Sequence, residues 1–72
     1  MFRGSALRRL TRQTALVHTV DGQSFRGVVI GVYEDALALA HVNVLLGEAE
    51  QELVGEVVVP LENISFIQRA LP

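Results

Sequence analysis

Cysteine and tryptophan are absent from this 72-residue chain, and proline occurs only twice. Without cysteine the chain has no disulfide framework and no cysteine-based metal site. No apolar run approaches the roughly 20 residues that cross a bilayer, and the N-terminus lacks the hydrophobic stretch of a signal peptide. We therefore expect a soluble, cytoplasmic protein with a single domain over residues 1–72, near the lower size limit for a core that is stable without cross-links.

Charged residues make up only 19% of the chain, and the two signs are segregated along it. Residues 1–26 hold five of the six arginines and one acid, which gives a net charge of +4, whereas residues 27–72 hold one arginine and seven acids, which gives −6. Half of the residues are hydrophobic, and the mean hydropathy of +0.37 is high for so small a soluble domain. We therefore expect part of the apolar surface to be buried between subunits.

The clearest local signal is Asp21-Gly22, which lies between two stretches of β-forming residues. Tight turns between antiparallel strands need positive φ angles, which glycine and aspartate tolerate, so this pair predicts a hairpin with positive φ at Gly22. Gly27 and Gly31 follow on the second strand, where a glycine usually marks a sharp bend or a close backbone approach. A strand that bends there can belong to two halves of a small barrel.

Hydrophobic periodicity and turn residues predict a short helix followed by five strands, with the helix at about 5–12 and the strands at about 14–20, 23–33, 36–45, 53–59 and 64–68. In the helix, Leu7 and Leu10 share one face and should dock on the domain, which leaves the arginines outward. The Ala/Leu alternation after residue 36 also fits a helix, but its β-rich neighbours favour a strand. The acidic stretch 47–52 indicates a solvated loop.

No group of residues in the sequence is typical of a catalytic or metal site. His18 has no second histidine or carboxylate at a suitable spacing, so we interpret it as an ordinary strand histidine. Glu34 and Asp35 are adjacent at a strand end, where their side chains diverge, and the spacing supports no Ser-His-Asp grouping. We therefore expect a protein that is not an enzyme and that uses no cofactor or metal.

The order of these features resembles the Sm and Sm-like (LSm) family over nearly the whole chain, from about Ser5 to Gln68. The residues that match its first motif are Val17, Asp21-Gly22, Phe25-Arg26-Gly27-Val28 and Gly31, and those that match its second motif are Gly55, Val57-Val58-Val59, Pro60-Leu61 and Asn63-Ile64. The resemblance implies an all-β (small α+β) fold, in which an N-terminal helix precedes a strongly bent five-stranded β-barrel.

Members of the family form rings in which strand four of one subunit pairs with strand five of the next, so that neither edge stays exposed. The residues of the corresponding segments here are apolar: Val57, Val58, Val59, Ile64, Phe66 and Ile67. A monomer could not safely expose such edges. The resemblance therefore implies a homo-oligomeric ring of about five or more subunits, in which the chain is its own partner.

Rings of this family also bind single-stranded RNA, commonly U-rich or A-rich, at loops beside the pore, where bases stack and meet asparagine and arginine side chains. The side chains that take those positions here offer no donor to a base edge: Asp35, Leu37, Pro60 and Leu61. Shifting the third strand by one residue places Ala38 at the asparagine position, which is no better. Carboxylates repeated around the pore would repel phosphates: Glu34, Asp35 and Glu62. Tyr33 is the one candidate for stacking, and the alternative is a half-buried aromatic at a strand end.

Two functions stay open at this point. The first is an RNA-binding ring whose contact surface is the helix rather than the pore loops, with four arginines in each subunit: Arg3, Arg8, Arg9 and Arg12. A ring would repeat these arginines into a continuous basic annulus. The second is a structural or adaptor ring that binds protein partners and no RNA, and the loss of the base-reading residues favours it.

Overall fold

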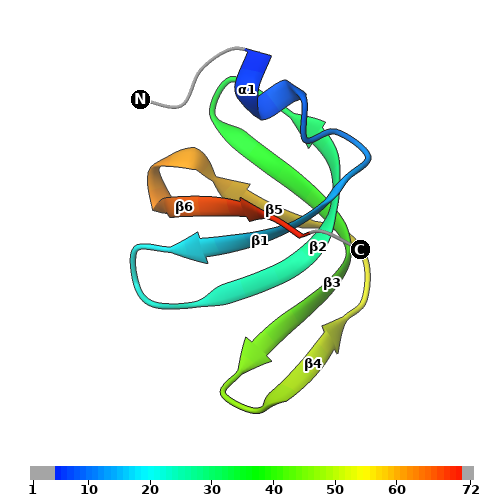
Figure 1. The fold of residues 1–72 in the computed structure, drawn as a ribbon, viewed down its shortest axis with the longest axis vertical. Coiled ribbons are helices and arrows are strands. Elements are labelled where there is room, and N and C mark those ends of the chain that lie inside the picture. The colour runs from blue at the N-terminus through cyan, green and yellow to red at the C-terminus, as the bar shows by residue number, and fades with distance from the viewer. Residues whose placement is uncertain (1–4, 71–72) are drawn as a thin grey trace.

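The computed structural model of the chain describes residues 5–70, which form a short helix, a bent antiparallel sheet and one 3₁₀ turn (Figure 1). The elements in chain order are α1 (Ser5–Arg8), β1 (Thr14–Thr19), β2 (Ser24–Val32), β3 (Ala36–Leu46), β4 (Ala49–Leu53), β5 (Val57–Pro60), η1 (Leu61–Asn63) and β6 (Ile64–Arg69). The helix lies at one end of the molecule, and the hairpin of β3 and β4 extends from the other. The predicted fold class is confirmed.

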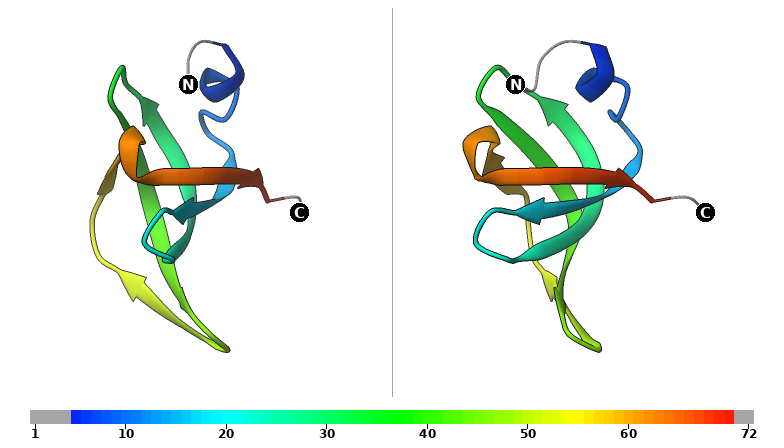
Figure 2. Two further views of the ribbon diagram at one scale, coloured as in Figure 1. Left: turned by 90° about the vertical axis from the view of Figure 1, so that its left-hand side faces the viewer. Right: turned by 60° about the vertical axis from the view of Figure 1, so that its left-hand side comes forward.

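All strand pairs are antiparallel, and the sheet has the order β4-β3-β2-β1-β6, with β5 paired to β3 as well. The long strand β3 pairs with β5 through residues 36–39 and with β4 through residues 42–46. Of the predicted fourth strand over 53–59, Leu53 is the last residue of β4 and residues 57–59 belong to β5, with residues 54–56 between the two strands. Figure 2 shows β1 and β6 side by side, running across the direction of β3, so the sheet curls around its own interior.

Two irregularities bend β2 at the predicted glycines. The pairing of β2 with β3 shifts register once between Arg26 and Val28, at Gly27, and again between Val29 and Gly31. A Cβ atom at Gly27 would come within 2.9 Å of Val42 Cγ2 and 3.1 Å of the Ala40 carbonyl oxygen, so a side chain does not fit between the strands there. His41, on β3 opposite this bulge, has a left-handed φ of 54°. The prediction that these glycines lie where β2 bends is confirmed.

The β1–β2 hairpin turns where Asp21-Gly22 predicted it. Gly22 has a φ of 91°, as expected. Its N–H donates to the Thr19 carbonyl oxygen at 3.1 Å, and the Thr19 N–H donates to the Gln23 carbonyl oxygen at 2.9 Å. The Thr19 hydroxyl also donates to the Asp21 carboxylate. Side chain and backbone together therefore fix a short turn with glycine at its left-handed position.

The stretch 47–52, predicted as a solvated loop, is mostly strand, so that prediction is wrong. Gly47, with a φ of 64°, and Glu48 form a two-residue turn, after which Ala49 pairs with Leu46 at the start of β4. Glycine at the first position of such a turn is typical of a type II′ hairpin. The residues of β4 are poor strand formers, and the pairing with β3 outweighs that preference.

The predicted helix over 5–12 is α-helical only in α1. The next residues form tight turns, in which the Leu10 N–H donates to the Leu7 carbonyl oxygen at 3.0 Å and the Gln13 N–H to the Leu10 carbonyl oxygen at 2.8 Å. Arg12 has a φ of 70°, and its N–H donates to the Val29 carbonyl oxygen at 2.7 Å. These contacts turn the chain into β1 and bind it to β2, which is why the helix stops early.

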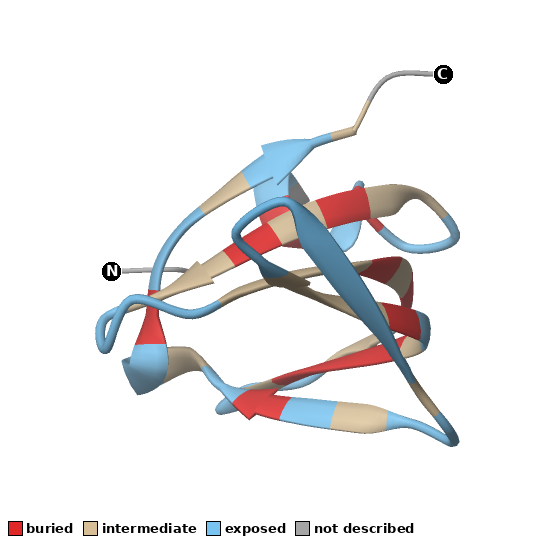
Figure 3. Cartoon of the chain, turned by 90° about the horizontal axis from the view of Figure 1, so that it is seen from below, coloured by how far each residue is buried: buried red, intermediate tan, exposed pale blue. Residues whose placement is uncertain are grey.

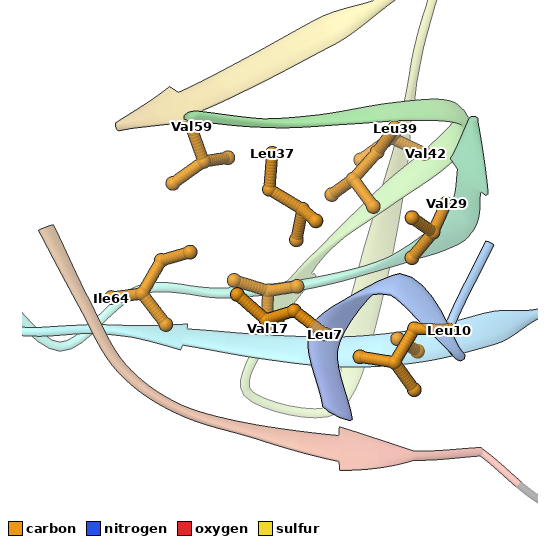
Figure 4. Close-up of a cluster of buried hydrophobic side chains, with 10 residues drawn as sticks. Leu7, Leu10, Val17, Val29, Leu37, Leu39, Val42, Val59 and Ile64 are labelled. Atoms are coloured by element: carbon orange, nitrogen blue, oxygen red, sulfur yellow. The ribbon is translucent and has the colours of Figure 1, made fainter. Parts of the chain in front are cut away.

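The core fills the space that the bent sheet encloses, as the burial pattern in Figure 3 shows. Figure 4 shows side chains from α1, the turn after it and the strands pointing toward one another in this interior. The buried cluster consists of Leu7, Leu10, Ala15, Val17, Val29, Leu37, Leu39, Val42, Val59 and Ile64. Leu7 and Leu10 close one end of the interior, and the prediction that they dock on the domain is confirmed.

Candidate functional site

The strands on either side of η1, β5 and β6, each pair along one side only. β5 pairs with β3, and β6 pairs with β1, so the second backbone edge of each is free in the described part of the chain. Apolar side chains stand beside these edges, since Val58 on β5 is 59% exposed and Phe66 on β6 is 50% exposed. Free edges with exposed apolar residues are surfaces that a further strand can cover.

The other four residues predicted for a ring interface are less accessible. Val59 and Ile64 belong to the core and are almost fully buried. Val57 and Ile67 are half-buried and pack against that core. These four side chains therefore stabilise the barrel itself, and what their strands can offer a neighbour is the backbone edge.

Phe66 stacks on His18, which lies opposite it on β1. The ring centroids are 4.2 Å apart and the ring planes meet at 18°. His18 Nδ1 lies 2.9 Å from the Ser24 hydroxyl, and Nε2 lies 2.8 Å from Gln68 Oε1. Because Gln68 Oε1 only accepts, Nε2 donates to it, and the Ser24 hydroxyl donates to Nδ1. The strand histidine predicted from the sequence thus supports the exposed ring of Phe66, a role that only the pairing of β1 with β6 reveals.

Three of the four residues that take the family's pore positions, Asp35, Pro60 and Leu61, come together between the β2–β3 turn and η1. The Leu61 N–H donates to the Asp35 carbonyl oxygen at 2.9 Å, and Pro60 lies opposite Ala36 in the β3–β5 pairing. Leu37 does not join them, because its side chain is fully buried in the core. The exposed carboxylates at this end of the barrel are Glu34, Asp35 and Glu62. This surface is acidic, and none of the four pore positions carries the amide or guanidinium group that reads bases.

Tyr33 is 59% exposed at the end of β2. Its N–H donates to the Ala36 carbonyl oxygen at 2.9 Å and closes the β2–β3 turn. Its ring lies over Gly31, where an added Cβ would come within 2.8 Å of the ring atoms. The outer atoms of the ring therefore lie close to the chain's own backbone, and the tyrosine is more exposed than the half-buried alternative predicted.

Three of the four arginines predicted for the helix face are exposed. Arg8 ends α1, and Arg9 and Arg12 lie in the turns that follow it. The one ion pair among residues 5–70 joins other residues, so these three charges have no carboxylate partner in that part of the chain. Arg3 lies outside the described residues. Arg8, Arg9 and Arg12 therefore form an exposed basic group without ion pairs at the end of the barrel that α1 covers, where the β2–β3 turn with Glu34 and Asp35 also lies (Figure 1).

That ion pair joins Arg26 on β2 to Glu50 on β4, across the intervening strand β3. The side-chain hydrogen bond between them raises the pKa of Arg26 above its usual value and lowers the pKa of Glu50 below its own. Both side chains are exposed to solvent, so the pair adds little to stability. It does hold the Glu50 side chain against the outer face of the sheet.

Two classes of site find no support in residues 5–70. Histidine, aspartate and glutamate side chains do not gather there in any group of three that could hold a metal ion. None of the helical segments in this range is long and apolar enough to cross a membrane.

No protein-family model and no curated protein sequence matches the chain, but solved structures do. A heptameric archaeal Sm protein matches with a TM-score of 0.85 at 23% identity, over 94% of this chain and 100% of the other. The SmAP1 heptamer of P. aerophilum matches with a TM-score of 0.85 at 22% identity, over 100% of both chains. A chain of the NatC complex bound to CoA matches with a TM-score of 0.78 at 22% identity, over 97% of this chain and 90% of the other. The fold of this chain is therefore that of the Sm-like proteins.

Proposed function

We propose that the chain forms a closed homo-oligomeric ring, in which β5 of one subunit pairs with β6 of the next, and that the ring binds single-stranded RNA without catalysing a reaction. The observation that carries the proposal is the pair of free edges on β5 and β6, with Val58 and Phe66 exposed beside them. The likeness of at least 94% of the chain to two heptameric proteins supports it.

The geometry of the edges favours a ring over a two-fold dimer. The free edges belong to different strands, so pairing one with the other is a head-to-tail contact, and such contacts close into rings when the rotation allows. Val58 and Phe66 both face away from the core, so they would lie on the same face of the joined sheet and pack against each other. Each contact would then bury two apolar side chains that one subunit leaves in water.

The arginines give the ring its affinity for RNA. Arg8, Arg9 and Arg12 would recur once in every subunit at the end of the barrel that α1 covers, and a basic band of this kind attracts phosphates. The pore positions supply no base-reading donor, since Leu37 is buried and a carboxylate stands at Asp35. The ring should therefore bind RNA through its backbone, with weak preference for sequence.

A fluorescence anisotropy titration with U-rich and A-rich RNA oligomers tests the proposal. Replacing Arg8, Arg9 and Arg12 together with alanine should weaken binding roughly tenfold or more at low salt, and the wild-type affinity should fall steeply as salt rises. Arg26→Ala is the matched control, because that arginine is already paired with a carboxylate and should matter little. Asp35→Ala should strengthen binding or leave it unchanged. If the triple variant and the wild type bound RNA equally well, or if tight U-specific binding were lost in Asp35→Ala, the RNA-binding site would be at the pore and not at the arginines.

A structural or adaptor ring that binds protein and no RNA is the second candidate. The acidic surface at the β2–β3 turn and η1 favours it, and so does the likeness to a chain of the NatC complex, since that protein works within a protein assembly. The same titration separates the two functions. A ring that fails to bind either RNA at low salt would be an adaptor.

A further inference from the structure

β4 is the end strand of the sheet, and one of its two edges has no partner in residues 5–70. The proposed ring uses the edges of β5 and β6, so it does not require the edge of β4. Figure 1 shows the β3–β4 hairpin extending away from the end that α1 covers, where a partner could reach it. β4 contains no proline, and its register with β3 is regular, so proline and a β-bulge, two of the features that commonly block an added strand, are missing from it.

The two-residue turn between β3 and β4, at Gly47 and Glu48, determines which backbone groups of β4 face the open edge. In such a turn the Ala49 N–H points toward the Leu46 carbonyl oxygen, and along an antiparallel strand the N–H and C=O groups point to alternate sides, residue by residue. Every second residue from Ala49 onward thus faces β3, whereas the backbone groups of Glu50 and Glu52 face outward. These N–H and C=O groups are free to pair with an incoming strand.

The charge around this edge is negative. The exposed carboxylates are those of Glu48, Glu50, Glu52 and Glu56. Glu50 is paired with Arg26, and the other three have no basic partner among residues 5–70. Glu52 is the one of these three that lies within β4, so its carboxylate stands on the face of the sheet beside the open backbone edge.

From the open edge and its charge we infer that β4 binds an extended basic segment of a partner protein, which adds to the sheet as a further strand. Lysine or arginine at alternate positions of that segment would lie on the same face as Glu50 and Glu52. A second copy of β4 is a poor partner, because antiparallel pairing of two copies about Gln51 would set Glu50 of each against Glu52 of the other. The same carboxylates repel the phosphates of a nucleic acid.

Amide hydrogen exchange measured by NMR on the full chain tests this inference, with a nine-residue, end-blocked peptide in which lysine alternates with threonine. Saturable binding should slow the exchange of the Glu50 and Glu52 amides at least about tenfold, because the added strand takes up their N–H groups. The Gln51 amide, which faces β3, should change much less. The same peptide with glutamate in place of lysine should not bind, nor should the lysine peptide with a central proline.

Glu52→Lys should weaken peptide binding about tenfold. Glu34→Lys makes the same change of charge at the other end of β3 and should leave binding unchanged. If both variants lost peptide affinity equally, the loss would follow from the change in the net charge of the protein alone, and this result would overturn the inference. Binding without slower exchange at Glu50 and Glu52, or no saturable binding of the lysine peptide, would overturn it as well. RNA binding and ring mass are separate readouts, so failure here leaves the proposed function standing.

Discussion

Replacing Gly27 with alanine should destabilise the protein, because the strands approach too closely there for a side chain. The new Cβ would meet Val42 Cγ2 at 2.9 Å, the Ala40 carbonyl oxygen at 3.1 Å and Leu39 Cβ at 3.4 Å. Val42 and Leu39 are fully buried, and the carbonyl belongs to the backbone of β3, so the clash can be relieved only by moving the strand or repacking the core.

The net cost follows from two opposing effects. Overpacking of this kind costs about 1–3 kcal/mol. Alanine also restricts the unfolded chain more than glycine does, and this stabilising effect offsets about 0.4–1 kcal/mol of the overpacking cost. We therefore expect Gly27→Ala to lose about 1–2 kcal/mol, which corresponds to a fall in melting temperature of roughly 5–15 °C for a domain of this size.

Gly31→Ala is the matched control on the same strand. The atoms nearest to its Cβ would be outer atoms of the Tyr33 side chain, which is exposed and can swing into solvent, so the cost should stay within about 0.5 kcal/mol. Thermal unfolding followed by circular dichroism, at one protein concentration for all variants, measures both changes. A loss for Gly31→Ala as large as that for Gly27→Ala, or a more stable Gly27→Ala, would refute the reasoning.

Two further predictions concern the hairpin turn and the ion pair. Gly22→Val should lower the free energy of unfolding by about 1 kcal/mol or more, because a β-branched residue resists the φ of 91°. Chemical denaturation measures this change, and an unchanged free energy of unfolding would show that the turn tolerates valine. Arg26→Ala should raise the pKa of Glu50 back toward its usual value, because the hydrogen bond that lowers this pKa is lost. In the wild type, the stabilisation from this pair is present above the ordinary pKa of glutamate and is lost as the pH falls through the lowered pKa of Glu50. An NMR pH titration of the Glu50 carboxyl carbon that gave the same midpoint in both proteins would contradict the pairing.

The parts of the fold that the sequence predicted are those governed by local chemistry. Asp21-Gly22 predicts a turn because few residues tolerate the left-handed backbone that such a turn needs, and Gly22 does have a left-handed φ. The alternation along the first strand predicted one apolar face, and Ala15 and Val17 are both fully buried. Such signals lie within a few residues of one another and depend little on the rest of the chain.

The parts that it could not predict depend on contacts between distant residues. β4 is rich in glutamate and looks like a solvated loop until β3 is placed beside it. The helix stops early because Arg12 pairs with the backbone of Val29, another contact that no local pattern shows.

The same division applies to the candidate site. Six apolar residues were predicted for the ring interface, but the alternation of side chains leaves only Val58 and Phe66 exposed among them. Leu37 matched a base-reading position by alignment, yet its side chain belongs to the core. The support that His18 gives to Phe66 joins strands that are far apart in the sequence, so residue spacing gave no sign of it.

The most direct test of the central claim is the mass of the purified protein in solution, measured by light scattering coupled to size exclusion at micromolar concentration. The ring predicts one species of at least about five times the 7.9 kDa of a single chain. Val58→Asp should dissociate it, whereas Val54→Asp, which changes a fully exposed valine outside the strands, should not. A folded monomer, or a wide distribution of masses from open chains of subunits, would contradict a closed ring joined through β5 and β6.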